Sequence, residues 1–235
     1  MMRRDQENPV VDAGERQLKR YRLFRQGCYD RRRNVIDAYE LLLREQVAQK
    51  WQLPLDFSVL TPEVFAQTVA EAIAHLPGKT KAMINLDHDQ FVNRQMLQAL
   101  VAVQQGAPQH QLIIELTERD AGLSILDTTL IDAAEFVTGQ GLKLSLDDVG
   151  SGENQFEFLQ PLLPFAVELK FALQNFNATA QDSYQQLVFW HQLALSEAKD
   201  FVLEGIESAA DLALADRLAV NLLQGYYYER PQKFY

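Results

Sequence analysis

The stretch Leu142-Lys143-Leu144-Ser145-Leu146-Asp147-Asp148 is a short, strand-like apolar run that ends in two carboxylates. Comparable runs recur along the chain and end in polar residues, and longer helical patterns separate them. This alternation predicts an α/β fold, and eight strands favour a closed, TIM-like (β/α)8 barrel over an open sheet. The expected strands lie near residues 21–26, 35–42, 82–86, 112–116, 142–147, 166–170, 201–204 and 221–225.

Helical patterns fill most of the gaps between these strands. Thr61 and Pro62 are typical of an N-cap followed by the first helical position, and this helix should run to about His75. Pro77 and Gly78 should end it. Further helices are expected near residues 90–105, 123–138, 183–196 and 209–218.

The first two strands break the regular alternation. Only residues 27–34 separate them, whereas a parallel pair needs a crossover of a dozen or more residues. The first strand is therefore expected to run antiparallel to the rest, in a barrel that is not a regular one.

Length and composition favour one intracellular domain. The 235 residues fit a loose N-terminal arm over residues 1–17 and a barrel over 18–235, with 47% hydrophobic residues to form its core. No apolar run approaches the roughly 20 residues of a membrane span. The lone Cys28 cannot form an internal disulfide, so we expect a cytoplasmic protein. The net charge of −10 argues against binding to a nucleic-acid polymer.

Polar groups that suit a metal ion lie at or near the ends of seven of the eight predicted strands. In barrel enzymes the reactive groups lie at the carboxyl ends of the strands, so the fold should gather these residues into one ring. The residues are Glu40, Asn85, Glu115, Asp147, Asp148, Lys170, Glu204 and Gln224.

Five carboxylates that share one small mouth repel one another unless cations lie between them. Carboxylate and amide oxygens are the ligands that Mg²⁺ and Mn²⁺ prefer, so we expect one of these ions. Two ions about 3.5–4 Å apart would stabilise both oxygens of a displacement at phosphorus. The adjacent pair Asp147 and Asp148 could bridge them. No His or Cys stands at a predicted strand end, which argues against zinc.

At these residues the sequence resembles the EAL domain family of cyclic di-GMP phosphodiesterases, from about Tyr21 to Pro231. The resemblance rests on ordered motifs that are spread over nearly the whole chain. They are Glu40-Leu41-Leu42-Leu43-Arg44, Ile84-Asn85-Leu86, Glu115-Leu116-Thr117-Glu118, Asp147-Asp148-Val149-Gly150-Ser151-Gly152, Leu169-Lys170, Glu204-Gly205-Ile206-Glu207 and Gln224-Gly225-Tyr226.

The resemblance implies a metal-dependent hydrolysis of one phosphodiester of cyclic di-GMP, which yields the linear dinucleotide pGpG. It implies that one ion is held by Glu40, Asn85, Glu115 and Asp147. Asp147 would bridge to a second ion, with Asp148 and Glu204 binding that ion or its waters.

The other implied roles concern the reacting water, the substrate and a loop. Lys170 would position the attacking water and offset developing negative charge. Glu118 would anchor the loop after Asp148, which family members use to link metal binding with homodimer contacts. The implied substrate-binding residues are Gln26, Arg44 and Gln224.

Several departures from the family pattern leave the metal ligands in place. Gly27-Cys28 follows Gln26 where Pro-Ile is usual, Leu41 replaces an alanine, and residues 149 and 153–155 differ in the loop after Asp148. Two alternatives therefore stand beside the phosphodiesterase. One is a non-catalytic EAL-like module that binds cyclic di-GMP or a protein partner as a regulator. The other is a barrel hydrolase that acts on a different phosphodiester.

Overall fold

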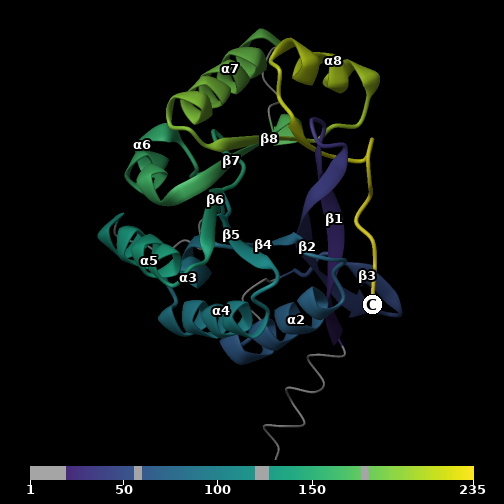
Figure 1. The fold of residues 1–235 in the computed structure, drawn as a ribbon, viewed down its shortest axis with the longest axis vertical. Coiled ribbons are helices and arrows are strands. Elements are labelled where there is room, and N and C mark those ends of the chain that lie inside the picture. Colours follow the sequence, from purple (N-terminus) through teal and green to yellow (C-terminus); the bar gives the residue numbers. More distant parts are fainter. Residues whose placement is uncertain (1–19, 56–59, 120–126, 176–179) are drawn as a thin grey trace, which may run out of the picture.

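Eight strands close a barrel that helices surround in the computed structural model, which describes residues 20–55, 60–119, 127–175 and 180–235 (Figure 1). β1 pairs antiparallel with β2 and β9, and every other neighbouring pair in the barrel is parallel. The predicted barrel with a reversed first strand is thereby confirmed. The strands are β1 (Tyr21–Asp30), β2 (Val35–Val47), β4 (Lys81–Leu86), β5 (Gln111–Leu116), β6 (Lys143–Leu146), β7 (Ala166–Ala172), β8 (Asp200–Glu204) and β9 (Leu222–Gln224).

The helices lie outside the barrel and bury apolar faces against it. As predicted, Thr61 caps the first of these helices, Pro62 opens it, and it ends at Ala74. No helix in the described ranges is both long and apolar enough to cross a membrane. The α-helices are α2 (Pro62–Ala74), α3 (His88–Phe91), α4 (Arg94–Gly106), α5 (Asp127–Gly139), α6 (Phe156–Leu159), α7 (Ala180–Ser196) and α8 (Ala209–Arg217). Two 3-10 helices, η2 (Gln160–Phe165) and η3 (Leu173–Asn175), lie before and after β7.

The first hairpin is longer than the sequence indicated. Residues 27–30 continue β1, so the connection shrinks to a tight turn over residues 31–34, in which Asn34 adopts a φ of 58°. β2 extends to Val47 and folds back into the short strand β3 (Lys50–Gln52), which the sequence analysis missed. The predicted N-terminal arm over residues 1–17 lies outside the described residues.

The helix expected over residues 90–105 is two helices. α3 ends at Phe91, and the Asn93 side chain accepts hydrogen bonds from the backbone N–H groups of Gln95 and Met96 at 3.0 and 3.2 Å. Asn93 is therefore an N-cap that starts α4 anew, because asparagine satisfies the free N–H groups of a first turn. The apolar period continues across this break and conceals it from a pattern search.

Ion pairs tie the first hairpin to β4 at the amino end of the parallel strands. Asp37 accepts a hydrogen bond from Lys81 Nζ at 2.7 Å and pairs with the Arg33 guanidinium. Burial by itself raises the pKa of Asp37, but the bonds from Lys81 and Arg33 lower it on balance. The folded state therefore prefers the ionised carboxyl. This preference stabilises the fold above the ordinary Asp pKa of about 4 and is lost as the pH falls through the lowered value.

We expect Asp37→Asn to lower the free energy of unfolding by about 1–3 kcal/mol at pH 7, because two charge-assisted hydrogen bonds are weakened. Thermal unfolding from pH 7 to pH 3 tests this. The gap between variant and wild type should narrow below about pH 4. A gap of the same size at every pH would contradict the assignment.

Gly225 lies where two backbone segments meet at the end of β9. Its φ is +154°, and a Cβ atom there would lie 2.2 Å from the carbonyl oxygen of Ile206 and 2.4 Å from its nitrogen. Ile206 is itself fixed, because its N–H donates to the Gln224 carbonyl at 3.1 Å. A side chain at position 225 must therefore push β9 away from the segment after β8.

We expect Gly225→Ala to lower the free energy of unfolding by about 1–3 kcal/mol from backbone strain, with a further loss from the overlap. The matched control is Gly139→Ala, at the last position of α5, where an added Cβ would meet nothing within 4 Å. Calorimetric unfolding compares the two variants. Equal melting temperatures would refute the close approach at Gly225.

Candidate active site

Inward-facing side chains fill the barrel in successive layers, because alternate residues of a strand face the same side. The lower layer consists mainly of the apolar cluster Cys28, Ala38, Met83, Ile113, Val202 and Leu222. Two residues further toward the mouth on the same strands stand Gln26, Glu40, Asn85, Glu115, Glu204 and Gln224. The apolar layer therefore closes the barrel beneath a ring of polar groups.

Lys170 stands at the centre of this ring and is fully buried. Its Nζ lies 2.7 Å from Glu115 Oε1 and 2.6 Å from Glu204 Oε1. Asp147 Oδ1 is 3.4 Å away and Glu40 Oε2 is 4.0 Å away. Residues on β2, β5, β7 and β8, together with Asp147 directly after β6, thus bring four carboxylates around one ammonium group, as the sequence predicted.

Glu40 is oriented by two amide groups, one from the neighbouring strand β4 and one from β9, on the far side of β1. Asn85 Nδ2 donates to its Oε1 at 2.6 Å, and Gln224 Nε2 donates to its Oε2 at 2.5 Å. These bonds link β2 with β4 and β9. They hold the carboxylate toward the mouth, where Glu40 remains 7% exposed.

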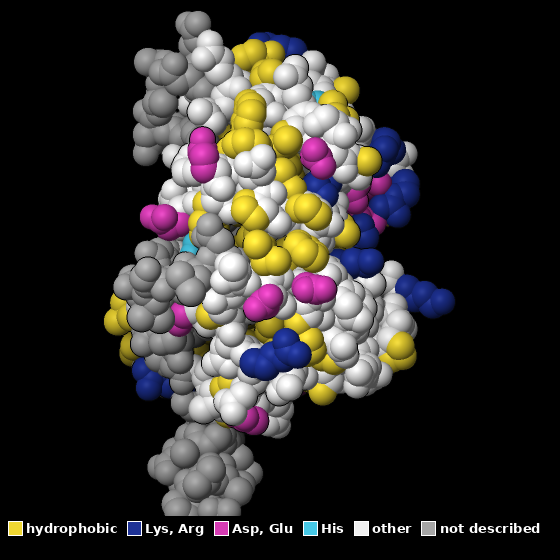
Figure 2. All heavy atoms as spheres, turned by 90° about the vertical axis from the view of Figure 1, so that its left-hand side faces the viewer, with side chains coloured by type: hydrophobic (Ala, Val, Ile, Leu, Met, Phe, Trp, Pro, Cys, Tyr) yellow, Lys and Arg dark blue, Asp and Glu magenta, His cyan; other side chains and the backbone are white. Residues whose placement is uncertain are grey.

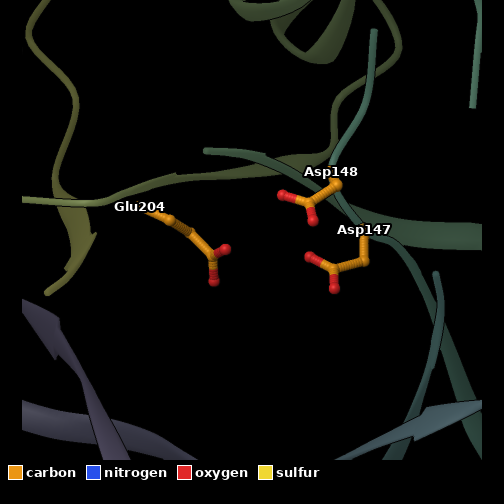
Figure 3. Close-up of side chains that lie close together, drawn as sticks. All are labelled: Asp147, Asp148 and Glu204. Carbon is orange, nitrogen blue, oxygen red and sulfur yellow. The ribbon is translucent and has the colours of Figure 1, made fainter. Parts of the chain in front are cut away.

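Among the described residues, Asp147, Asp148 and Glu204 form a compact acidic group and point into a common space (Figure 3). Each offers a carboxylate oxygen, and these oxygens lie within 4.8 Å of one another. Asp148 adopts a φ of 48°, a left-handed conformation that aspartate tolerates better than most residues. Consecutive aspartates can therefore both turn toward Glu204.

The buried Asn154 fixes the backbone beneath this group. Its Nδ2 donates to the carbonyl of Asp147 at 2.5 Å and to that of Leu116 at 3.1 Å. The sequence showed Asn154 only as a departure from the family pattern. Its structural role was not predicted, because hydrogen bonds from a side chain to the backbone do not affect the spacing of motifs. Asn154 is a structural link between β5 and the loop after β6.

The predicted loop anchor Glu118 touches the same loop through its backbone and side chain. Its carbonyl accepts from the N–H of Glu153 at 3.2 Å. A Cβ on Gly152 would lie 2.7 Å from that carbonyl oxygen, so the loop passes directly against Glu118. Both residues follow strands whose ends carry the acidic ring.

Burial gives these groups strongly shifted pKa values. It raises the pKa of Glu115 and Glu204 well above the ordinary range, although Lys170 acts in the opposite direction. Burial, together with Asp147 and Glu118, raises the pKa of Asp148 to about 8. Burial alone lowers the pKa of Lys170, yet the surrounding carboxylates raise it on balance. The site thus concentrates more negative charge than its surroundings stabilise.

The donor set fits a hard divalent cation. With all groups ionised, the five carboxylates outnumber the one buried ammonium. Within the described part of the chain, Glu115 Oε2 and Asp148 Oδ1 are buried without a hydrogen-bond donor. Oxygen atoms of this kind are the ligands of Mg²⁺, Mn²⁺ and Ca²⁺. A cation would supply the missing partners and lower the pKa values that burial raises.

A cavity of about 480 Å³ opens above the ring, a size typical of ligand sites. The predicted residues Gln26, Glu40, Arg44, Asn85, Glu118, Asp147, Asp148, Glu204 and Gln224 all line it. Glu115 and Lys170 do not line it and lie fully buried in the barrel. The cavity is also lined by residues that the sequence analysis did not select, among them Asp87, Arg119, Gln174 and Tyr226.

The predicted substrate residues lie on the β1, β2 and β9 side of this cavity. Gln26 Nε2 donates to the carbonyl of Glu229 at 2.9 Å, which fixes its orientation. Arg44 Nη1 donates to the carbonyl of Leu43 at 2.8 Å, and its half-buried guanidinium lies near Glu40 and Tyr226. These contacts place amide and guanidinium donors beside the acidic ring.

Fold and site together define a TIM-like barrel with an acidic mouth at the carboxyl ends of its parallel strands, whose oxygen donors fit a divalent cation. The sequence model of the EAL domain family matches residues 15–231 of this chain. The chain belongs to the EAL domain family.

Several known proteins are similar to this chain in sequence or in structure. The probable cyclic di-GMP phosphodiesterase PdeD of Escherichia coli K12 is 28% identical over 227 residues, which cover 90% of this chain and 41% of PdeD. The PaMucR phosphodiesterase, solved as a c-di-GMP complex, has a TM-score of 0.77 at 23% identity over 95% of each chain. YkuI of Bacillus subtilis, solved with c-di-GMP and calcium, has a TM-score of 0.75 at 17% identity over 97% of this chain and 58% of YkuI. The chain spans about two fifths or less of the curated relatives it matches.

Proposed function

We propose that this chain hydrolyses cyclic di-GMP to linear pGpG with the help of two Mg²⁺ or Mn²⁺ ions. The observation that carries the proposal is the convergence of four carboxylates within 4.0 Å of Lys170 Nζ, beside the open cavity. The relatives named as cyclic di-GMP phosphodiesterases and the EAL structures that contain c-di-GMP support this substrate.

Glu40, Asn85, Glu115 and Asp147 would hold one ion, and Asp147, Asp148 and Glu204 would hold the other. The ions, when bound, activate water and offset the charge on the phosphate. In the hydrolysis, the attacking water loses a proton and its oxygen bonds to phosphorus. The bond from phosphorus to the ribose 3′-oxygen breaks, and that oxygen gains a proton.

The protein's own groups orient this exchange. Lys170 would place the attacking water and oppose the negative charge that develops on the phosphate oxygens. Its ion pairs with Glu115 and Glu204 fix its ammonium before substrate binds. Gln26, Arg44 and Gln224 would hold the dinucleotide, with Arg44 as a charge-assisted donor to phosphate.

Incubation with cyclic di-GMP and Mg²⁺ or Mn²⁺ tests the proposal, with the linear product separated by chromatography. We expect pGpG to accumulate only when a divalent cation is present. Binding of cyclic di-GMP without turnover would support the alternative of a non-catalytic regulatory module instead. That alternative is favoured by the altered residues 153–155, in the loop that contacts Glu118.

The homodimer implied by the family resemblance would form through a surface other than the cavity. On the side of the molecule that carries α5 and α6, hydrophobic side chains gather in the middle of the face, with acidic and basic side chains around them (Figure 2). Apolar patches favour association, whether with a second copy or with a protein partner. Light scattering of the purified chain should give about twice its 26.8 kDa for a dimer. We also propose that the protein is located in the cytoplasm.

A further inference from the structure

The cavity is lined by many acidic groups and by few cationic ones. Carboxylates from seven residues face it, whereas Arg44 and Arg119 are the Lys or Arg side chains that line it among the described residues. Arg44 lies on β2, and Arg119 follows β5, two strands further around the barrel. The two guanidinium groups therefore approach the cavity from different strands.

Arg119 is held in place by a short chain of contacts. Its Nε lies 3.0 Å from Asp87 Oδ1, and the same oxygen accepts from Thr117 Oγ1 at 2.8 Å. The backbone N–H of Asp87 donates to Gln90 Oε1 at 3.1 Å, which fixes Asp87 at the start of α3. The Arg119 side chain nevertheless remains 41% exposed, so it is oriented but still reaches solvent in the cavity.

The proposed substrate carries two phosphodiesters, and hydrolysis uses only one of them. The second keeps its negative charge and must lie in a mouth that is mostly acidic. Without a cation nearby, this phosphate would be repelled by the cavity wall. A guanidinium is well suited to it, because it stays charged and donates two parallel hydrogen bonds.

We propose that Arg119 binds the non-scissile phosphate of the cyclic dinucleotide; this inference rests on the proposed function. Arg119 is a substrate-binding residue in this scheme and takes no part in bond breaking. Arg119 would make the site bind a cyclic dinucleotide more tightly than a small molecule with one phosphodiester. The Asp87 contact keeps the guanidinium on the β4 and β5 side of the cavity.

The test compares wild type with Arg119→Gln and Arg119→Lys in calorimetric binding of cyclic di-GMP in Ca²⁺, which accompanies c-di-GMP in the YkuI structure. Arg119→Gln should weaken binding about tenfold or more, as expected for a lost charge-assisted hydrogen bond. Arg119→Lys should recover part of this loss, because it keeps the charge. The matched control is Arg32→Gln in the β1–β2 turn, whose side chain is 64% exposed and pairs with Asp30 at 3.8 Å.

Cyclic di-AMP separates phosphate binding from base recognition, because it has the same phosphates and different bases. Arg119→Gln should weaken binding of both dinucleotides by the same factor. A loss confined to cyclic di-GMP would overturn the proposal in favour of a guanine contact. Unchanged affinity in Arg119→Gln, or an equal loss in Arg32→Gln, would also overturn it.

Turnover distinguishes this inference from the proposed function. If wild type binds cyclic di-GMP without cleaving it, only the catalytic proposal fails, and the effect of Arg119→Gln on binding still decides the inference. If wild type does not bind cyclic di-GMP, both proposals fail. Where wild type cleaves, Arg119→Gln should raise KM and leave kcat nearly unchanged, and it should not alter cleavage of bis(p-nitrophenyl) phosphate, which has one phosphodiester.

Discussion

Replacing Lys170 by methionine is expected to lower kcat for cyclic di-GMP by about 10²–10³-fold, the usual cost of losing one group that stabilises developing charge. The variant also leaves Glu115 and Glu204 without their 2.7 and 2.6 Å ion pairs. Removal of one partner from a buried ion pair typically costs about 3–5 kcal/mol of stability. Activity and stability should therefore fall together.

A divalent cation separates these two effects. In the absence of metal, Lys170→Met should melt well below wild type, and Mn²⁺ should restore part of the difference because it offsets the same carboxylates. Turnover should stay low even in saturating Mn²⁺. The matched control is Lys199→Met, which loses a hydrogen bond to the Ala166 carbonyl outside the cavity and should retain activity. Full activity of Lys170→Met would refute the role of the ammonium group.

Replacing Glu40 by glutamine should reduce turnover by more than about 100-fold. Loss of a residue that only hydrogen-bonds to a metal ligand typically costs about 10–100-fold, and Glu40 is proposed as a ligand itself. Glutamine keeps the shape of the side chain and removes the charge that the cation requires. Glutamine can accept only one of the two amide hydrogen bonds from Asn85 and Gln224. The fold should persist, because relief of the repulsion between Glu40 and the other carboxylates offsets this loss.

Glu45→Gln is the matched control for this prediction. Glu45 stands on the same strand, is 5% exposed and pairs with Arg20, but it does not line the cavity. Its variant should lose stability and keep activity, the reverse of Glu40→Gln. Steady-state kinetics and thermal unfolding of both proteins check this. Wild-type kcat in Glu40→Gln would remove Glu40 from the metal site.

The ring of acids could be predicted because strand period and barrel topology determine it. Glu204 ends β8, and Glu115 is the last residue but one of β5. Both face inward, two residues beyond the buried Val202 and Ile113. An inward-facing residue near the carboxyl end of a barrel strand must face the mouth of the barrel. The spacing of the motifs carried enough information for this part of the site.

Other features depend on contacts between loops, which follow no period. The pair of Asp87 and Arg119 joins the ends of two strands, and Asn154 binds two backbone carbonyls from different segments. The break between α3 and α4 depends on the side chain of Asn93 within a continuing apolar pattern. The full burial of Glu115 and Lys170 could not be predicted either, because the sequence does not distinguish a residue on the cavity floor from one beneath it.

Titration of Mn²⁺ into the metal-free protein tests most directly whether cations hold these acids together. Electron paramagnetic resonance, which counts free Mn²⁺, should show saturable binding of two ions per chain. Glu115→Gln should weaken it, and Glu45→Gln should not. Absence of saturable binding, or identical binding in Glu115→Gln and wild type, would contradict a metal site at the mouth of this barrel.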